Sequence, residues 1–267
     1  MSYKLALPKN YSRRIWRAIM EFEMLQPGDK VLVGLSGGKD SALLLFALKV
    51  LQQQTGYPFE LGAVTVDAGF SSESYQDILT ELCTALSVPL YYERHPELQE
   101  IVFDPQHRQN PCARCAFFRR GIINRIAVKE GYNKVALGHH LDDAVETFLM
   151  SILLAGKIET FTPVTSQDRS QVTVIRPLVL LREKEITGAK RFFPWEPLPS
   201  CCPQEGNGGR ALVKQLIREL SLRDPQLFWR VVSAMRRTTE EIVLWPAEAD
   251  ALTMRSHYLE MLKHIGK

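Results

Sequence analysis

Residues 36–41 read Ser-Gly-Gly-Lys-Asp-Ser, and their types and spacing suit the binding of a phosphate group. The two glycines allow the backbone to turn tightly and to approach a ligand closely. The lysine adds a positive charge, and the two serines add hydroxyl groups. Apolar residues precede and follow this sequence, as expected for a buried strand that leads into a buried helix. The free N–H groups at the start of that helix would favour an anion.

The spacing separates this sequence from two other phosphate-binding loops. The Walker loop requires four residues between its first glycine and a Gly-Lys pair, and the dinucleotide motif requires Gly-x-Gly-x-x-Gly. Residues 34–41 satisfy neither pattern. An ordinary glycine-rich turn is the alternative interpretation, and the match of six consecutive residues between two apolar stretches favours phosphate binding.

A second group of polar residues, His-His-Leu-Asp-Asp, begins at His139 and follows a short apolar stretch that we interpret as a strand. In open α/β sheets, ligands bind beyond the carboxyl ends of the strands, so His139 and Ser36 are expected to converge on one crevice. Carboxylates beside a polyphosphate commonly hold Mg²⁺, which points to Asp142 or Asp143. Helix N-capping by Asp142 and burial of a hydrogen-bonded His139 are the alternatives.

The five cysteines form a third group of candidate ligands. An odd number of cysteines argues against a disulfide framework, and Cys83 fits an apolar helical pattern. Cys112 and Cys115 form a Cys-x-x-Cys, which is compatible with zinc, a redox dithiol or an iron–sulfur cluster. Cys201 and Cys202 are adjacent and would strain to bind one ion together. Three usable thiolates suit a [4Fe–4S] cluster with one open iron, or zinc with an outside ligand, and unligated thiols are the alternative.

The composition is that of a soluble globular protein, with 45% hydrophobic and 24% charged residues. No apolar run approaches the ~20 residues that cross a bilayer, and the first ten residues lack the apolar core of a signal peptide. We therefore expect a cytoplasmic protein with no membrane partner. The net charge is only +3, but residues 105–134 carry seven basic side chains and one acidic one. This basic window predicts a polyanionic partner, with a solvated helix face as the alternative.

Strands and helices alternate along most of the chain. Apolar stretches bounded by turn residues predict five strands, near residues 31–35, 61–66, 88–93, 135–138 and 172–176. This alternation indicates an α/β fold with a parallel, five-stranded, doubly wound sheet and helical additions at both ends. Residues 96–111 are expected to form a loop that ends at the Cys-x-x-Cys. We divide the chain into an N-terminal helical segment (1–27), an α/β domain with the Cys-x-x-Cys insertion (28–193), and a cysteine loop with C-terminal helices (194–267).

Four motifs occur in a fixed order along the chain. They are Ser-Gly-Gly-Lys-Asp-Ser (36–41), Pro-Cys-Ala-Arg-Cys (111–115), Gly-His-His-Leu-Asp-Asp (138–143) and Ile-Arg-Pro-Leu (175–178). The first resembles the PP-loop of the ATP pyrophosphatases. The ordered combination resembles the TtcA family of tRNA 2-thiocytidine synthetases, within the TtcA/TtuA group of PP-loop tRNA thiolases. The resemblance covers nearly the whole chain and implies the PP-loop, or adenine nucleotide α-hydrolase-like, type of sheet.

This resemblance implies a tRNA sulfurtransferase that is an adenylate-forming ATP pyrophosphatase. Such an enzyme transfers AMP from ATP to the C2 oxygen of a tRNA pyrimidine, here first of all cytidine, and replaces that oxygen with sulfur delivered through a [4Fe–4S] cluster. The implied ATP ligands are Ser36, Gly37, Gly38, Lys39, Asp40, Ser41, Val66, Asp67, Gly138 and His139. The implied catalytic residues are Lys39, Asp142, Asp143 and Cys202, and the implied Mg²⁺ ligands are Asp40 and Asp142.

The resemblance also implies how the cluster and the tRNA are held. Cys112 and Cys115 would bind the cluster with a third cysteine, for which we choose Cys202 because it precedes a proline, with Cys201 as the alternative. The implied contacts with tRNA phosphates are Arg114, Arg119, Arg120, Arg176 and Lys184. The expected partners are tRNA and a sulfur donor, either a cysteine desulfurase or free sulfide, and a homodimer is one assembly to test.

Three other functions are compatible with parts of the sequence. A 2-thiouridine-type tRNA thiolase shares the PP-loop and the cysteines, but the zinc ribbons that flank that type are absent. Another PP-loop ligase would use the cysteines for a structural zinc ion. A nucleotide-binding RNA module without turnover would need neither Asp142 nor Asp143, and the presence of both carboxylates argues against it.

Overall fold

The computed structural model describes residues 4–71, 74–106, 111–167, 171–200, 202–204, 208–236 and 244–265. The alternative cluster ligand Cys201 lies outside these ranges, as does Arg108 of the basic window. None of the helices within these ranges combines the length and the apolar composition that crossing a bilayer requires.

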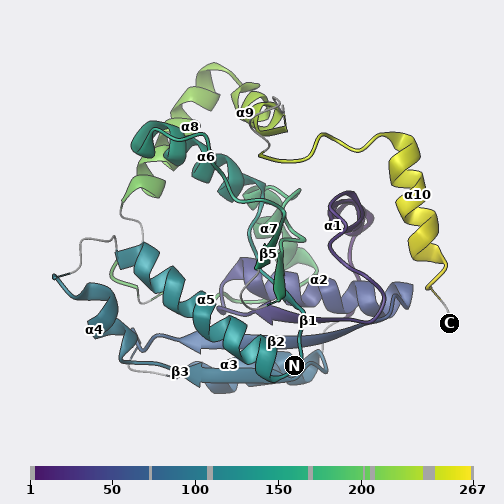
Figure 1. The fold of residues 1–267 in the computed structure, drawn as a ribbon, viewed down its shortest axis with the longest axis horizontal. Coiled ribbons are helices and arrows are strands. Elements are labelled where there is room, and N and C mark those ends of the chain that lie inside the picture. The colour runs from purple at the N-terminus through teal and green to yellow at the C-terminus, as the bar shows by residue number, and fades with distance from the viewer. Residues whose placement is uncertain are drawn as a thin grey trace.

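A six-stranded sheet forms the centre of the fold (Figure 1). Its strands lie in the order β3-β2-β1-β4-β6-β5, and every neighbouring pair from β3 to β6 is parallel. The predicted parallel five-stranded sheet is therefore confirmed, and the structure adds an antiparallel edge strand, β5. The strands are β1 (Asp29–Gly34), β2 (Phe59–Asp67), β3 (Leu90–Arg94), β4 (Lys134–Ala136), β5 (Val164–Gln167) and β6 (Val172–Ile175).

The central strand β1 is buried on both faces because its side chains alternate between two apolar cores. Val31 and Val33 face one core, and Leu32 faces the other, and all three are fully buried. Such two-sided burial is typical of parallel strands that are covered by helices. It explains why the sequence of β1 is an unbroken apolar run rather than an alternating one.

Helices cover both faces of the sheet (Figure 1). One face packs against α4 and α5, and the other packs against α2 and its neighbours, while α8 and α9 lie beside α6 and α10 lies beside α1. The helices are α1 (Lys9–Glu21), α2 (Lys39–Thr55), α3 (Gln76–Ala85), α4 (Leu98–Phe103), α5 (Pro111–Lys129), α6 (Leu141–Ala155), α7 (Glu183–Gly188), α8 (Gly209–Arg223), α9 (Leu227–Arg236) and α10 (Ala251–Leu262), and a 3₁₀ turn spans Ala189–Arg191.

Two features differ from the sequence-based expectations. Part of the segment expected to be a loop forms the short helix α4, because Leu98 and Val102 are buried against the sheet. Helix α5 begins at Pro111, so Cys112 and Cys115 lie within its first turns rather than at the end of a loop. Residues three apart on a helix are neighbours on one face, so the helix itself brings the two thiols together.

The C-terminal helices are attached to α1 through a buried carboxylate. Glu21 accepts hydrogen bonds from Arg236 of α9 at 2.5 Å and from Arg17 at 3.0 Å, and its side chain is only 1% exposed. The guanidinium of Arg236 also lies 5.5 Å from the ring centroid of Phe22 and 5.7 Å from that of Trp245. Because Glu21 is buried, loss of either cation would leave its carboxylate with fewer partners in a place that water does not reach.

Replacement of Arg236 by alanine should therefore lower the free energy of unfolding by about 2–3 kcal/mol, because one hydrogen-bonded cation is removed from a buried carboxylate and Arg17 remains. Urea denaturation monitored by circular dichroism measures this change. Arg230→Ala is the matched control, since Arg230 is 71% exposed and pairs with Asp224 on the surface. Equal effects of the two substitutions would contradict the anchoring role of Arg236.

Candidate functional site

The phosphate-binding turn is closed by its own serines. Ser41 Oγ lies 3.0 Å from Ser36 Oγ, accepts a hydrogen bond from the Ser36 N–H at 3.1 Å, and donates to the Gly38 carbonyl at 3.1 Å. Helix α2 starts at Lys39, and its N-cap residue Gly38 provides no side-chain cap. The first N–H groups of α2 therefore remain available to an anion, which is what a phosphate site requires.

The ends of four parallel strands meet beside this turn. Residues at or just beyond the carboxyl ends of β1, β2, β4 and β6 line a cavity of about 540 Å³, which we call the strand-end cavity. It contains the predicted ligands Ser36, Asp40, Ser41, Val66, Gly138 and His139, together with Asp143 and Arg176. A side chain at Gly138 would meet the backbone of Asp40 and Ser41 at 3.0 Å, so a glycine is needed where β4 approaches the start of α2.

Three residues that line this cavity each have a buried polar atom with no hydrogen bond among the described residues. The atoms are His139 Nδ1, Arg176 Nε and Asp40 Oδ1, and the last of these is paired with the Lys39 ammonium at 3.2 Å. Burial lowers the pKa of His139 to about 4, and the nearby Arg176 contributes to this shift, so the imidazole is neutral near pH 7. Burial likewise lowers the pKa of Arg176 to about 10. Unsatisfied buried groups of this kind suit a polar ligand, because a ligand would supply the missing partners.

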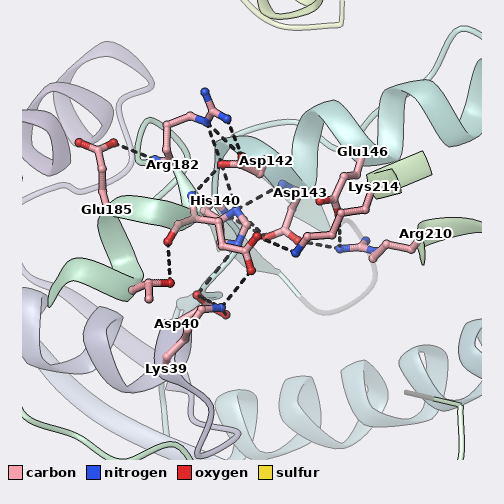
Figure 2. A network of polar contacts seen from close by, with 12 residues as sticks. Lys39, Asp40, His140, Asp142, Asp143, Glu146, Arg182, Glu185, Arg210 and Lys214 are labelled. Carbon is pink, nitrogen blue, oxygen red and sulfur yellow. Dashed lines mark hydrogen bonds and ion pairs between the residues drawn. The ribbon is translucent and has the colours of Figure 1, made fainter. Parts of the chain in front are cut away.

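The two neighbouring aspartates at the start of α6 have different surroundings (Figure 2). Asp142 accepts hydrogen bonds from Arg182 Nε at 3.1 Å and from the N–H of Glu183 at 2.7 Å, so it stabilises the start of α7. It does not line the strand-end cavity. The predicted Mg²⁺ role of Asp142 therefore stays a prediction, and its observed partners are those of a structural carboxylate.

Asp143 faces the cavity and has an exposed cationic partner. It forms a capping box with His140, and its Oδ1 lies 2.6 Å from Arg210 Nη1 of α8. Arg210 also lies 3.7 Å from Glu146, whose burial raises its pKa to about 7. Asp143 and Asp40 are thus the two carboxylates that share the strand-end cavity.

Lysine residues from two helices meet on one glutamate, Glu183. Lys39 Nζ lies 3.2 Å from Asp40 and 3.4 Å from Glu183, and Lys214 of α8 lies 2.6 Å from Glu183. Arg210, Lys214 and Glu183 were not among the residues predicted from the sequence. A detectable signal was the spacing of Arg210 and Lys214, which places two cations on one helix face directly after the cysteine loop.

A second cavity, of about 350 Å³, is lined by two of the candidate cluster ligands, Cys115 and Cys202, and we call it the thiol cavity. Cys112 lies three residues before Cys115 on α5. Burial raises the pKa of the Cys115 thiol, the neighbouring Cys202 and Cys112 raise it further, and Arg119 opposes the shift. The predicted ATP ligand Asp67 lines this cavity rather than the strand-end cavity, and it accepts a hydrogen bond from Tyr92 at 2.7 Å.

The candidate cluster ligands come from two segments of the chain. Cys115 and Cys202 line the thiol cavity, and Cys112 precedes Cys115 by three residues on α5. Among the described residues, no group of three or more His, Cys, Asp and Glu side chains forms a site for a metal ion. A structural zinc ion needs four ligands around one point, whereas a [4Fe–4S] cluster binds each thiolate at a different iron.

The candidate tRNA contacts fall into three groups. Arg119 and Arg120 line the strand-end cavity, and Lys184 is exposed on α7, so all three can meet a ligand. The predicted contact of Arg114 with a tRNA phosphate does not fit the structure. Arg114 is 5% exposed and donates hydrogen bonds to the carbonyls of Val102 and Asp104, so its guanidinium is not presented at the surface. Arg176 is also buried, and it points into the strand-end cavity.

Comparison with known proteins gives concordant results. A family model described as the PP-loop domain matches residues 9–193. The tRNA-cytidine(32) 2-sulfurtransferase of Bordetella pertussis is 37% identical over 86% of this chain and 72% of its own length. The enzyme of the same name from Legionella pneumophila is 36% identical over 82% of this chain and 78% of its own length. The structure of the U34-tRNA thiolase NcsA from Methanococcus maripaludis with its [4Fe-4S] cluster aligns with a TM-score of 0.72, at 26% identity over 88% of this chain and 80% of that chain.

The cysteines should differ in their reaction with iodoacetamide. Burial raises the pKa of Cys83 to about 12, so a fraction on the order of 10⁻⁴ is thiolate at pH 8, whereas Cys112 is exposed. In metal-free native protein, peptide mapping by mass spectrometry should find Cys112 alkylated and Cys83 alkylated only after denaturation. Comparable labelling of the two in native protein would contradict the packing of α3.

Proposed function

The chain belongs to the tRNA-cytidine(32) 2-sulfurtransferase family of PP-loop proteins, and on this basis we propose that it uses ATP to replace the C2 oxygen of a tRNA cytidine with sulfur. The observation that carries this proposal is the contact between the two cavities. Ser36, Val66 and Arg119 line both the strand-end cavity and the thiol cavity. A nucleotide activated in the first cavity would therefore lie next to thiols that can hold sulfur.

The first step requires the phosphate-binding turn. The C2 oxygen of the cytidine attacks the α-phosphorus of ATP, a new P–O bond forms, and pyrophosphate leaves as the α–β bond breaks. Lys39 and the uncapped N–H groups of α2 stabilise the negative charge that develops on the phosphates. Carbon C2 then carries a good leaving group, the AMP that is bonded to it through the original oxygen. A sulfur nucleophile adds at C2, and AMP departs with the original oxygen.

Two carboxylates would hold Mg²⁺ beside the phosphates. Asp40 and Asp143 fit this role because both carboxylates line the strand-end cavity beside the phosphate-binding turn. When bound, Mg²⁺ supplies positive charge opposite the phosphate oxygens. Because Asp143 lines the cavity and Asp142 does not, we place Asp143 rather than Asp142 beside the cation. Asp143 would then exchange its partner Arg210 for the ion.

The cysteines would hold the sulfur-bearing group. Cys112, Cys115 and Cys202 are the residues we assign to it, and Arg119 lies close enough to hydrogen-bond Cys115. When bound, a [4Fe–4S] cluster supplies an open iron at which sulfur can be held. Cys202 completes the set in our assignment because it shares the thiol cavity with Cys115.

The remaining parts of the proposal concern partners and organisation. The relatives act on tRNA, so tRNA is the polyanion that the basic window contacts, with Arg119 and Arg120 at the cavity and Lys184 on α7. A cysteine desulfurase or free sulfide would supply sulfur, and a cytoplasmic location follows from the tRNA substrate.

The proposed organisation of the chain keeps the boundaries at residues 27 and 193, which separate the N-terminal helical segment, the α/β domain and the cysteine loop with the C-terminal helices. A homodimer remains an assembly to test.

Nucleoside analysis of tRNA tests the function directly. A strain that lacks the gene should lose 2-thiocytidine from its tRNA, and the wild-type gene should restore it. Lys39→Ala should fail to restore it, and its rate of pyrophosphate release should fall by ~100-fold or more, because a charge on the transferring phosphate is lost.

The same measurement separates the alternatives. Loss of 2-thiouridine instead of 2-thiocytidine would redirect the proposal to a U34-type thiolase. Metal analysis of anaerobically purified protein should give about four iron atoms per chain, and about one zinc atom with no iron would favour another PP-loop ligase. Unchanged tRNA nucleosides in the deletion strain would refute the proposed function.

The exchange of Arg210 for a cation predicts a second result. Arg210→Gln removes the competitor of the metal at Asp143, so the affinity for Mn²⁺ without nucleotide should rise by about fivefold, the effect of one partly exposed ion pair. Electron paramagnetic resonance titration of free Mn²⁺ measures it. Arg223→Gln, in the exposed last turn of α8, is the control and should leave the affinity unchanged. Weaker binding by Arg210→Gln would show that Arg210 shapes the site instead of blocking it.

A further inference from the structure

One peptide group of the phosphate-binding turn is tied to the segment that leads to the third cysteine. The carbonyl oxygen of Gly37 accepts a hydrogen bond from Trp195 Nε1 at 2.9 Å and another from the Leu198 N–H at 3.1 Å. The Trp195 side chain is buried, so its indole N–H is shielded from water. Nothing in the chemistry proposed above uses Trp195.

These two hydrogen bonds determine which way the peptide faces. In a trans peptide the C=O and N–H groups point in opposite directions. Because the Gly37 carbonyl faces the segment 195–198, the N–H of Gly38 faces the interior of the turn, where Ser36 Oγ lies 3.4 Å away. A rotated peptide would present a carbonyl oxygen to the phosphates and repel them. The orientation seen here is the one that binds an anion.

The turn and the segment that leads to the cysteine pack closely. A side chain at Gly37 would meet Leu198 Cδ1 at 2.5 Å, and the φ of Gly37 is +80°, so the two segments meet around a left-handed residue. Prolines at 197 and 199 restrict the backbone that follows Trp195. Leu198, Pro199 and Ser200 line the thiol cavity together with Cys202, so a group bound in that cavity would contact the same segment that holds the turn.

We propose that Trp195 is a positioning residue that holds the Gly37–Gly38 peptide in its phosphate-binding orientation and so couples ATP affinity to occupation of the thiol cavity. The inference deepens the proposed function and rests on it. A group bound by the cysteines in the thiol cavity restrains Leu198, Pro199 and Ser200, which line that cavity, and so strengthens the hydrogen bonds to Gly37. Coupling between two binding sites is reciprocal, so bound ATP also steadies the segment that carries Cys202.

The test compares ATP dissociation constants without tRNA, by equilibrium dialysis, for anaerobically purified cluster-loaded protein and for the same protein stripped of iron. Stripping should weaken ATP binding to the wild type by about two- to tenfold, the range of one net hydrogen bond. Trp195→Phe keeps an aromatic ring and removes the N–H donor. The cluster-loaded Trp195→Phe variant should bind ATP as weakly as the iron-stripped wild type. Removal of iron should change the ATP dissociation constant of this variant little.

Two further variants keep the test decisive. Incorporation of 3-benzothienylalanine at position 195 preserves the shape of the indole and deletes only the N–H group, so it should reproduce the result of Trp195→Phe even if the latter disturbs packing. Trp16→Phe, on α1, is the matched control and should behave as the wild type. Wild-type ATP affinity and wild-type response to stripping in both position-195 variants would overturn this inference alone. Failure of the wild type to bind ATP in either form would overturn the proposed function and the inference with it.

Discussion

Burial of α2 is the constraint on which the rest of the site depends. Ten of its seventeen residues are buried, and residues 42–48 form an unbroken apolar run, so the helix cannot shift without exposing apolar surface to water. Its N-terminus, and the phosphate-binding turn attached to it, are therefore fixed relative to the sheet. Phe46 of α2 also stacks on Phe193, with ring centroids 4.5 Å apart, which fixes the start of the cysteine segment in the same frame.

Around this fixed turn, the charged residues divide into those that hold the fold and those that can exchange partners. Asp142 belongs to the first kind, because its partner Arg182 is itself held, with its guanidinium carbon 3.3 Å from the ring centroid of Phe228. Asp143 belongs to the second, because Arg210 is half-exposed and comes from α8. Successive residues of a helix point about 100° apart, so adjacent aspartates can serve two different neighbours. The two adjacent aspartates thus have different partners, Arg182 for Asp142 and Arg210 for Asp143.

The sequence predicted the parts of the site that depend on local pattern. The strands, the phosphate-binding turn and the position of His139 beyond β4 all followed from apolar runs and turn residues. The edge strand β5 was missed because Val164–Gln167 is short, and only its pairing with β6 makes it a strand. The resemblance implied that Arg114 and Arg176 contact tRNA phosphates, but both are buried and donate hydrogen bonds to backbone carbonyls. The spacing of Arg210 and Lys214 places them on one face of α8, but no local pattern reports which carboxylate each cation meets.

Arg119 forms part of the wall between the two cavities, together with Ser36 and Val66. An adenylated base is an electrophile, and water competes with sulfur for it throughout its lifetime. That lifetime is governed by how far the base must travel between activation and sulfur transfer. Because the same residues line both cavities, this path is short, and the layout of the fold itself limits loss of the intermediate to hydrolysis.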